Sequence, residues 1–565
     1  MSRKKTTRDL QISMSTPIES YDSGFFPSDV AVSVDQCLAE IDGIRLNERI
    51  WAHDATLWQG DPEAIGERLG WLHVGDTMQQ HEGCLLQFAE EVQQEGFTDT
   101  VLLGMGGSSL GAHVLGQVAR IGGNHPRLHV LDSTVPSAVH ALAGEVALDR
   151  TLFIVSSKSG GTLEPNLLYD FFRSMAEREL GAKDSGRHFI AITDPGTPLA
   201  ELAGQEGFRR LFLNPPDIGG RFSVLSLFGL VPGAIAGVVA SHMLDHARRM
   251  AHSCATSSSA AANPGAWLGA YLLGCVRTGR DKLTFITSPG LGSFGLWAEQ
   301  LLAESTGKNG KGIVPVVDEP FAPPECYAND RAFVYIRLKG DSNQESDRHA
   351  RLLVEAGLPC VTFTLKDGDS LGAEFFRWEY ATAVAGALLS INPFDQPDVQ
   401  SAKEATDRVL AEYVSAGTLP TIGPRAGAVE RLRDLRAPAY LALLAYFHET
   451  AGINSVFSEF RRRTVVARRT ATTLGYGPRY LHSTGQLHKG GPDSGFFVIL
   501  TTRQMEDAPI PGRPYGFDVV SQAQATGDFR ALSQRGRAVL HIELPSEEPL
   551  ELRAVLSKLA GPDTD

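Results

Sequence analysis

Short apolar runs alternate with helix-like stretches over most of the chain, and this alternation constrains the fold more than any other feature. A first series of such runs is followed, after a helix-like stretch, by a second series. The runs lie at residues 101–103, 128–131, 152–155, 189–192 and 211–213, and then at 283–286, 333–336 and 360–365. Such a rhythm is typical of parallel strands that are covered by helices on both faces. The sequence therefore predicts an α/β protein with two doubly wound parallel-sheet lobes.

The chain is long enough for several domains, because 565 residues exceed what a single hydrophobic core holds. The first ninety residues show helical patterning without strand alternation, and three tryptophans, Trp51, Trp58 and Trp71, are expected to anchor them. We expect an N-terminal tail and helical segment (1–90), a first lobe (91–240), a helical connector (241–280), a second lobe (281–420) and a C-terminal α/β section (421–565).

Charge and composition limit the classes of partner that this protein is expected to bind. The formal net charge of −14 disfavours a nucleic-acid partner, and any phosphate site in this chain must carry a positive field of its own. No apolar stretch has the length of a signal peptide or a membrane span, so we expect no membrane partner. The six cysteines are scattered without a pairing framework. These features are typical of a cytoplasmic protein.

A glycine-rich turn, GMGGSSLG at 104–111, follows the first predicted strand and precedes a helix. Its Gly107 and Ser108 suit a phosphate group, which backbone amides, a hydroxyl and a helix N-terminus can hold. A dinucleotide site is an alternative, with Asp132 as the ribose-binding acid, but Ser109 occupies the position of the third fingerprint glycine. A purely structural tight turn is the other alternative.

A second turn, SSKSGGT at 156–162, lies two strands further along the same predicted sheet. The candidate phosphate ligands are Ser157, Lys158, Ser159 and Thr162. One of these hydroxyls could equally cap the helix that follows, and capping is compatible with phosphate binding. Because parallel strands bring their following loops to one edge, we expect both turns to face the same cleft.

These turns and three later segments, in this order, resemble the sugar isomerase (SIS) domains of the glucose-6-phosphate isomerase family. The resemblance covers roughly residues 90 to 545 and implies an SIS-type fold. The matching segments are GMGGSSLG (104–111), SSKSGGTLEPN (156–166), DIGGRFS (217–223), WAEQLLAESTGK (297–308) and NPFDQPDVQSAK (392–403).

The resemblance implies roles that residue type alone does not establish. Arg221 alone would be a solvated loop residue, Glu304 a helix-end carboxylate and Lys403 a surface lysine. By resemblance, Arg221 stabilises the charge of the enolised sugar, while Glu304 moves a proton between C1 and C2. Lys403 would assist ring opening, and Gln300, one helical turn before Glu304, would contact the sugar or its phosphate.

The catalytic histidine departs from the common family pattern, because no matching motif lies between the glutamate and lysine segments. The nearest match is HSTGQLHKGG at 482–491, which resembles the isomerase part of bifunctional transaldolase/glucose-6-phosphate isomerase proteins. Its neighbours favour His488 over His482 as the group that exchanges a proton with the ring oxygen. Only about 85 residues precede the first turn, against ~250 in a typical (β/α)8 barrel, so no transaldolase half is expected.

The resemblance implies an enzyme that interconverts glucose 6-phosphate and fructose 6-phosphate through a cis-enediolate. It also implies that the protein is a homodimer and that its ligand is a small hexose phosphate. No cofactor is expected, and no metal, since the two histidines of the motif have no cysteines or carboxylates near them in sequence. The main alternative is a phosphosugar sensor without catalysis. Arg221, Glu304 and Lys403 favour the enzyme, and a nicotinamide-dependent dehydrogenase is less favoured still.

Overall fold

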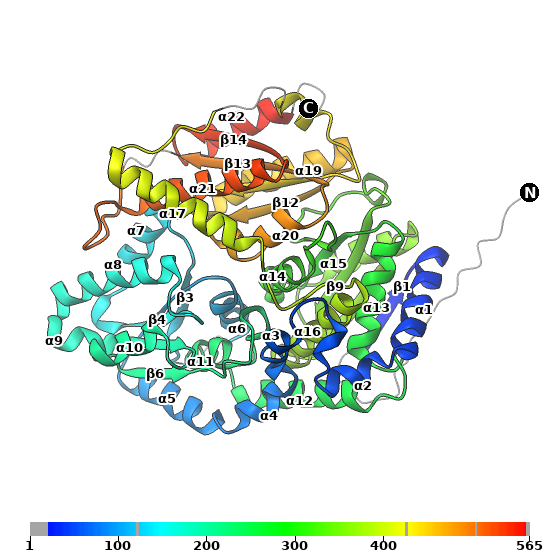
Figure 1. Cartoon of the computed structure of the whole chain (residues 1–565), viewed down its shortest axis with the longest axis horizontal. Helices are drawn as coiled ribbons and strands as arrows, with labels where there is room; N and C mark the ends of the chain where they lie inside the picture. Colours follow the sequence, from blue (N-terminus) through cyan, green and yellow to red (C-terminus); the bar gives the residue numbers. More distant parts are fainter. Residues whose placement is uncertain (1–20, 120–123, 424–427, 503–505, 561–565) are drawn as a thin grey trace, which may run out of the picture.

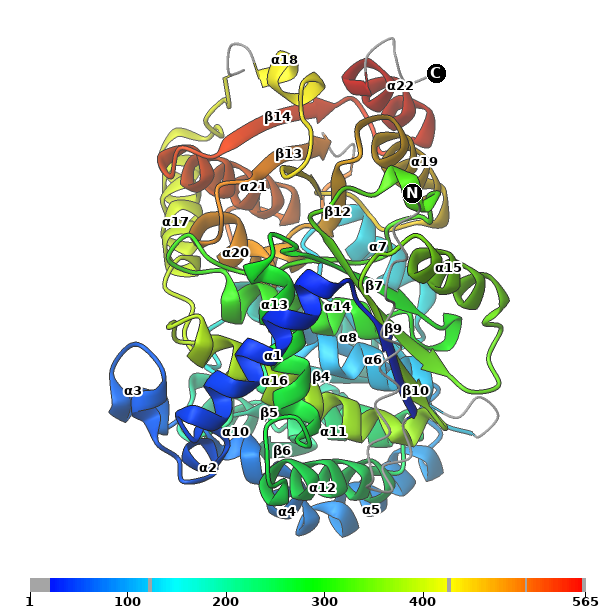
Figure 2. The same cartoon turned by 90° about the vertical axis from the view of Figure 1, so that its right-hand side faces the viewer.

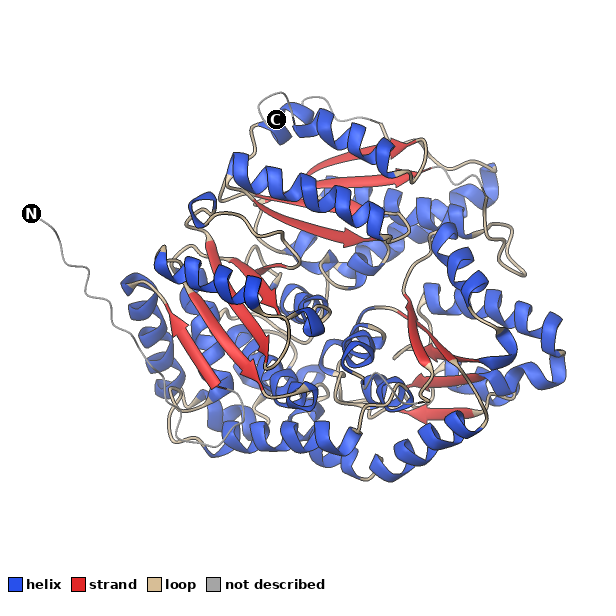
Figure 3. Cartoon of the chain, turned by 180° about the vertical axis from the view of Figure 1, so that it is seen from behind, coloured by secondary structure: helices blue, strands red, loops and turns tan. Residues whose placement is uncertain are grey.

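The computed structural model describes residues 21–119, 124–423, 428–502 and 506–560. Three β-sheets, each with helices on its faces, lie around the middle of the molecule (Figure 1 and Figure 3). The predicted α/β class with parallel sheets is confirmed. None of the described helices is both long enough and apolar enough to cross a bilayer.

The first sheet is wholly parallel, with the strand order β3-β2-β4-β5-β6. Both central strands, β2 and β4, are buried at every position, which is why their sequences are continuous apolar runs. The strands are β2 (Asp99–Gly104), β3 (Arg127–Leu131), β4 (Thr151–Ser156), β5 (Phe189–Thr193) and β6 (Arg210–Leu213). The accompanying helices are α5 (Glu82–Gln94), α6 (Leu110–Val118), α7 (Pro136–Glu145), α8 (Leu163–Leu180), α10 (Pro198–Gln205) and α11 (Leu227–Ile235).

The second sheet has the order β1-β10-β9-β7-β8 and is parallel except at one edge. Its strands are β1 (Tyr21–Phe25), β7 (Lys282–Thr287), β8 (Val314–Val316), β9 (Arg331–Leu338) and β10 (Cys360–Leu365). Its helices are α1 (Ser28–Gly43), α12 (Ala240–Thr256), α13 (Pro264–Arg277), α14 (Phe294–Thr306), α15 (Gln344–Glu355) and α16 (Leu371–Leu388).

The expectation of no strand in the first ninety residues is wrong, because β1 pairs antiparallel with β10 along the sheet edge (Figure 2). Its five residues, YDSGF, carry too little apolar patterning to signal a strand, and the pairing comes from the neighbouring edge. The short β8 was also not predicted. It is held between β7 and the third sheet unit by apolar packing around Val314 and Val316.

The third sheet is parallel, with the order β12-β11-β13-β14. Its strands are β11 (Tyr440–Ala445), β12 (Ala471–Tyr476), β13 (Gly495–Thr502) and β14 (Ala538–Leu544). Its helices are α17 (Val399–Ala416), α18 (Ala428–Arg433), α19 (Ala451–Arg468), α20 (Gly485–Gly490), α21 (Phe517–Gln534) and α22 (Pro549–Ala560). Strand β12 was not predicted, because ATTLGY contains few large apolar residues, yet it leads directly into the histidine segment.

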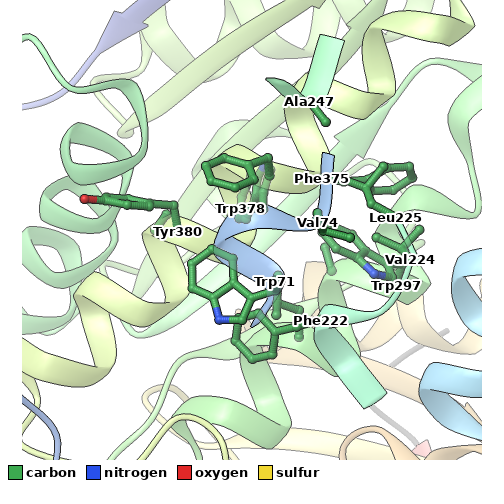
Figure 4. Packing of buried hydrophobic residues seen from close by; sticks show 14 of the residues in the cluster. Trp71, Val74, Phe222, Val224, Leu225, Ala247, Trp297, Phe375, Trp378 and Tyr380 are labelled. Atoms are coloured by element: carbon green, nitrogen blue, oxygen red, sulfur yellow. The ribbon is translucent and has the colours of Figure 1, made fainter. Parts of the chain in front are cut away.

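An aromatic core joins segments that are far apart in sequence (Figure 4). Trp71 and Trp58 are buried as predicted, while Trp51 is half-buried. The Trp71 ring lies 5.2 Å from that of Phe222, and Trp297 on α14 lies 4.8 Å from Phe375 on α16. Phe222 directly follows a predicted site residue, and Trp297 shares its helix with another. The core therefore fixes both segments relative to each other.

Candidate active site

A cavity of about 780 Å³ lies at the carboxyl edge of the first sheet. The loops that follow β2, β4, β5 and β6 line one side of it, as expected of parallel strands. Helices α14 and α17 and the segment after β12 line the other. The predicted site residues that face it are Gly107, Ser108, Lys158, Ser159, Thr162, Arg221, Gln300, Glu304, Lys403 and His482.

The glycine turn after β2 packs directly against the turn that carries Arg221. Gly106 has a positive φ of 55°, which favours glycine. A Cβ atom added to Gly107 would lie 2.1 Å from the carbonyl oxygen of Gly220. Backbone tightness is therefore one reason for these glycines, and it brings Ser108 to the cavity wall beside Arg221.

The second turn forms the opposite end of this wall. The Lys158 ammonium pairs with the carboxylate of Asp194 and donates to the Pro216 carbonyl at 3.0 Å, and burial lowers the pKa of Lys158. Ser157 is buried and is not a lining residue; its hydroxyl lies 3.0 Å from that of Thr162, which does line the cavity. Asp194 was not predicted, although its place directly after β5 marks it as a loop residue of the same edge.

Glu304 and Arg221 form an ion pair at the wall of the cavity. The Arg221 Nη1 atom lies 3.0 Å from Glu304 Oε2, and both side chains are at least nine-tenths buried. The guanidinium also donates to the carbonyl oxygens of Pro393 at 3.1 Å and Asp395 at 2.6 Å. Gln300 donates to Glu304 Oε2 at 3.2 Å. The carboxylate thus has a fixed orientation with donors on two sides.

Lys308, which lies just after the end of the helix that carries Glu304, was not predicted as a site residue. Its ammonium donates to the Asn392 carbonyl and lies 2.9 Å from Asp395, so it holds the loop that accepts hydrogen bonds from Arg221. Burial and the nearby Arg221 charge lower the pKa of Lys308 to about 7. The family-like segment that contains Glu304 ends at this lysine, which is the signal that could have identified it.

His482 enters the cavity from the single 3-10 turn Arg479–His482 that follows β12. Its Nε2 atom lies 2.9 Å from Glu164 Oε1, and its main-chain oxygen accepts from Gln300 at 2.8 Å. Gln524 also donates to Glu164 at 2.7 Å. Burial acts to raise the pKa of Glu164, but the charge and hydrogen bond of His482 outweigh it and the net pKa is lowered. Glu164 was missed, although it lies within the phosphate-turn motif.

The preference for His488 does not fit its position. Its side chain lies on α20, is 2% exposed and packs 4.8 Å from the ring of Phe497. It does not line the cavity, and burial holds its pKa well below the usual range. A side chain that does not line the cavity cannot exchange protons directly with a sugar bound there. The geometry therefore favours His482.

Lys403 lies on the first turns of α17 with an exposed side chain. It lines both the main cavity and an adjoining one of about 260 Å³, and His482 and Thr162 also border both. An ammonium and an imidazole thus face the same end of the site.

Asp132 directly follows β3, where a ribose-binding acid would lie, but it does not line the cavity. Its carboxylate is buried and accepts from Arg479 Nε at 2.9 and 3.0 Å. The dinucleotide alternative therefore lacks its acid. Among the described residues, no group of three or more histidine, cysteine or carboxylate side chains has the arrangement of a metal site.

A parallel α/β fold whose hydroxyl-rich turns face an arginine–glutamate pair is the arrangement expected of a sugar-phosphate isomerase. The family model described as phosphoglucose isomerase matches residues 88–313. A glucose-6-phosphate isomerase of Rubrobacter xylanophilus is 31% identical over 412 residues, which cover 64% of this chain and 92% of that protein. One of Leptospira biflexa is 28% identical over 386 residues, covering 60% and 85%. The chain belongs to the glucose-6-phosphate isomerase family.

A solved structure supports the same fold. The crystal structure of a glucose-6-phosphate isomerase from Chlamydia trachomatis superposes with a TM-score of 0.57 at 20% identity, covering 74% of this chain and 92% of that one.

Proposed function

We propose that this protein interconverts glucose 6-phosphate and fructose 6-phosphate through a cis-enediolate intermediate. The observation that carries the proposal is the buried Glu304–Arg221 pair, which faces the hydroxyl-rich turns across one cavity. A non-catalytic sensor would need the turns but not a base held beside a guanidinium. No step of the reaction needs a cofactor, because the proton that leaves one carbon returns to the next.

In this proposal the substrate phosphate is held by Ser108, Lys158, Ser159 and Thr162. Ser157 acts behind them by fixing the Thr162 hydroxyl. Arg68 also lines this part of the cavity, and with Lys158 it supplies local positive charge in a chain whose net charge is negative. Phosphate binding far from the reacting carbons then positions them for proton transfer.

Ring opening takes place at the other end of the cavity. His482 donates a proton to the ring oxygen as the bond between C1 and that oxygen breaks, and the imidazole regains a proton from the anomeric hydroxyl, whose oxygen becomes the carbonyl oxygen on C1. Glu164 orients the imidazole and stabilises its charged form. Lys403 stabilises the negative charge that develops on the oxygen atoms during this step.

Proton transfer follows on the open-chain aldose. The Glu304 carboxylate removes the proton from C2, the C1–C2 double bond forms, and the carbonyl oxygen on C1 becomes an oxyanion beside Arg221. Glu304 then returns the proton to C1, while the C2 hydroxyl passes its proton to the oxyanion on C1 and becomes the ketone oxygen. Gln300 keeps the carboxylate oriented throughout.

A coupled assay with fructose 6-phosphate tests this function. The wild-type protein is expected to turn over the hexose phosphate, and Glu304→Gln is expected to lose at least ~10²-fold in kcat, because an amide cannot act as the base. The same variant should still bind the sugar phosphate. A wild-type protein that binds hexose phosphate without turnover would establish the sensor instead.

The finer organisation is also proposed. We keep the five sections predicted at 1–90, 91–240, 241–280, 281–420 and 421–565 as a proposal. The three sheets lie in the sections 91–240, 281–420 and 421–565, except that the first section contributes β1 to the second lobe. Helix α17, in the fourth of the five sections, packs against α21 in the last. The segment at 482–491 supports a relationship to the isomerase part of bifunctional transaldolase fusions. Family resemblance supports a homodimer, and six free cysteines support a cytoplasmic location; light scattering of the purified protein tests the dimer.

A further inference from the structure

We propose that Arg479 is a positioning residue that holds His482 in the cavity by clasping the third sheet unit to the first. This inference rests on the proposed role of His482. Arg479 and His482 are the first and last residues of one 3-10 turn at the carboxyl end of β12. A single 3-10 turn is short and has weak hydrogen bonds of its own, so its orientation depends on side-chain anchors.

The clasp consists of Arg479, Asp132 and Glu449. The Arg479 Nε atom lies 2.9 and 3.0 Å from the two carboxylate oxygens of Asp132, and Nη2 lies 3.0 Å from Glu449 Oε2. Asp132 is the residue after β3 in the first sheet, whereas Glu449 precedes α19 in the third. One guanidinium therefore joins two sheet units. Only the planar fork of arginine can serve both carboxylates in this way.

Burial makes this clasp stronger than a surface ion pair. Asp132 is 3% exposed and the side chain of Arg479 is 17% exposed. The two carboxylates hold the pKa of Arg479 above its usual range, against the opposing effect of burial. His113 on α6, Glu299 on α14 and Tyr476 on β12 are other titratable groups that act on the clasp. Burial lowers the pKa of His113 and raises the pKa of Glu299 to about 8 and that of Tyr476 above its usual range, so burial favours the neutral form of all three. An unpaired Asp132 would be a buried charge, which is costly.

The turn has other anchors, and they act differently from Arg479. Glu164 in the first unit is hydrogen-bonded to the imidazole, and Gln300 on α14 donates to the His482 main-chain oxygen. Tyr480 is buried, and its hydroxyl donates to Asp528 at 2.9 Å, which fixes the turn within the third unit. Arg479 joins the start of the turn to the first unit. Without it the turn can shift relative to the cavity, and a misplacement of about 1 Å at a catalytic group can lower turnover roughly 10²-fold.

The test is a mutant cycle between Arg479 and His482. Arg479→Gln is expected to lower kcat for fructose 6-phosphate about 10- to 100-fold with KM within twofold, because the phosphate cradle is untouched. Asp132→Asn should give a similar loss, and Arg479→Lys should recover part of the activity. Combined with His482→Asn, Arg479→Gln should cause no further loss, since the residue acts through the histidine. Circular dichroism and thermal melting confirm folding of each variant.

A matched control is Arg553→Gln, which removes an exposed arginine of the same unit that pairs with Glu459 at 2.6 Å. It should leave kcat unchanged. The clasp is refuted if Arg479→Gln retains wild-type kcat while His482→Asn is impaired, or if the two losses multiply in the double variant. If His482→Asn itself has wild-type turnover, the proposed role of His482 fails first, and the clasp with it.

Discussion

Glu304 and Arg221 form a buried ion pair of 3.0 Å at the wall of the cavity: Glu304 lies on α14, which covers the second sheet, and Arg221 lies in the segment after β6, at the edge of the first sheet. The carboxylate of one sheet unit is thus held beside a cation of another. When the carboxylate removes a proton from the substrate, the positive guanidinium beside it can stabilise the enediolate as it forms.

Replacing Arg221 by lysine should separate this electrostatic role from simple charge. A lysine keeps the charge but cannot donate at once to Glu304 and to the carbonyls of Pro393 and Asp395. We expect kcat to fall about 10²- to 10³-fold, with KM changed little, in the fructose 6-phosphate assay. Arg210→Lys, at an exposed pair with Glu91, is the control. Wild-type kcat in Arg221→Lys would show that the fork geometry is dispensable.

The two histidines can be told apart with a substrate that cannot form a ring. His482→Asn should lower turnover of fructose 6-phosphate by about 10²-fold, but should have little effect on its 5-deoxy analogue, which has no hydroxyl with which to close the ring. His488→Asn should affect both substrates equally, through the packing against Phe497. An equal loss on both substrates in His482→Asn would contradict a role in ring opening.

Removal of the Lys158 ammonium should weaken phosphate recognition specifically. Lys158→Met is expected to raise KM for fructose 6-phosphate about tenfold or more and to reduce inhibition by inorganic phosphate to a similar extent. Because Asp194 would lose its partner, Lys158→Met/Asp194→Asn is the better-balanced variant. Unchanged phosphate inhibition in both variants would place the phosphate elsewhere.

Glu379 on α16 should make the free energy of unfolding larger in mild acid than at neutral pH. It is fully buried, neither oxygen has a hydrogen-bond partner in the described part of the chain, and burial raises its pKa well above the usual value. The folded state keeps this proton where the unfolded chain, with a pKa near 4.5, has lost it. Its contribution is therefore full below that value and declines by ~1.4 kcal/mol per pH unit as the pH rises toward the folded pKa.

The measurement is urea unfolding between pH 5 and 8. Glu379→Gln should lose less stability than the wild type over this range, so the difference between the two curves should grow with pH. Glu551→Gln, at an exposed position, should leave the pH dependence unchanged. Parallel curves for Glu379→Gln and the wild type would mean that Glu379 is ionised in the folded protein.

The interior strands could be predicted because burial on both faces demands continuous apolar sequence, as in β2 and β4. The strands that were missed, β1, β8 and β12, owe their conformation to a neighbouring edge or unit rather than to their own residues. The candidate site also contains some features that local sequence determines and others that depend on packing between units. Local motifs located the turns and Glu304, whereas the choice between His482 and His488 depended on how the third sheet docks, which no local pattern encodes.

The position of His482 after the carboxyl end of β12 means that this protein can lose turnover without losing sugar-phosphate binding. The imidazole that faces the cavity is carried by the third sheet unit, which contributes none of the proposed phosphate ligands, so the turns after β2 and β4 and the Glu304–Arg221 pair can be in place while the proposed ring-opening group is absent. A molecule in which the third sheet unit is not docked would retain its affinity for the sugar phosphate but would not open the sugar ring. In such a molecule, binding and turnover report on two different states of assembly.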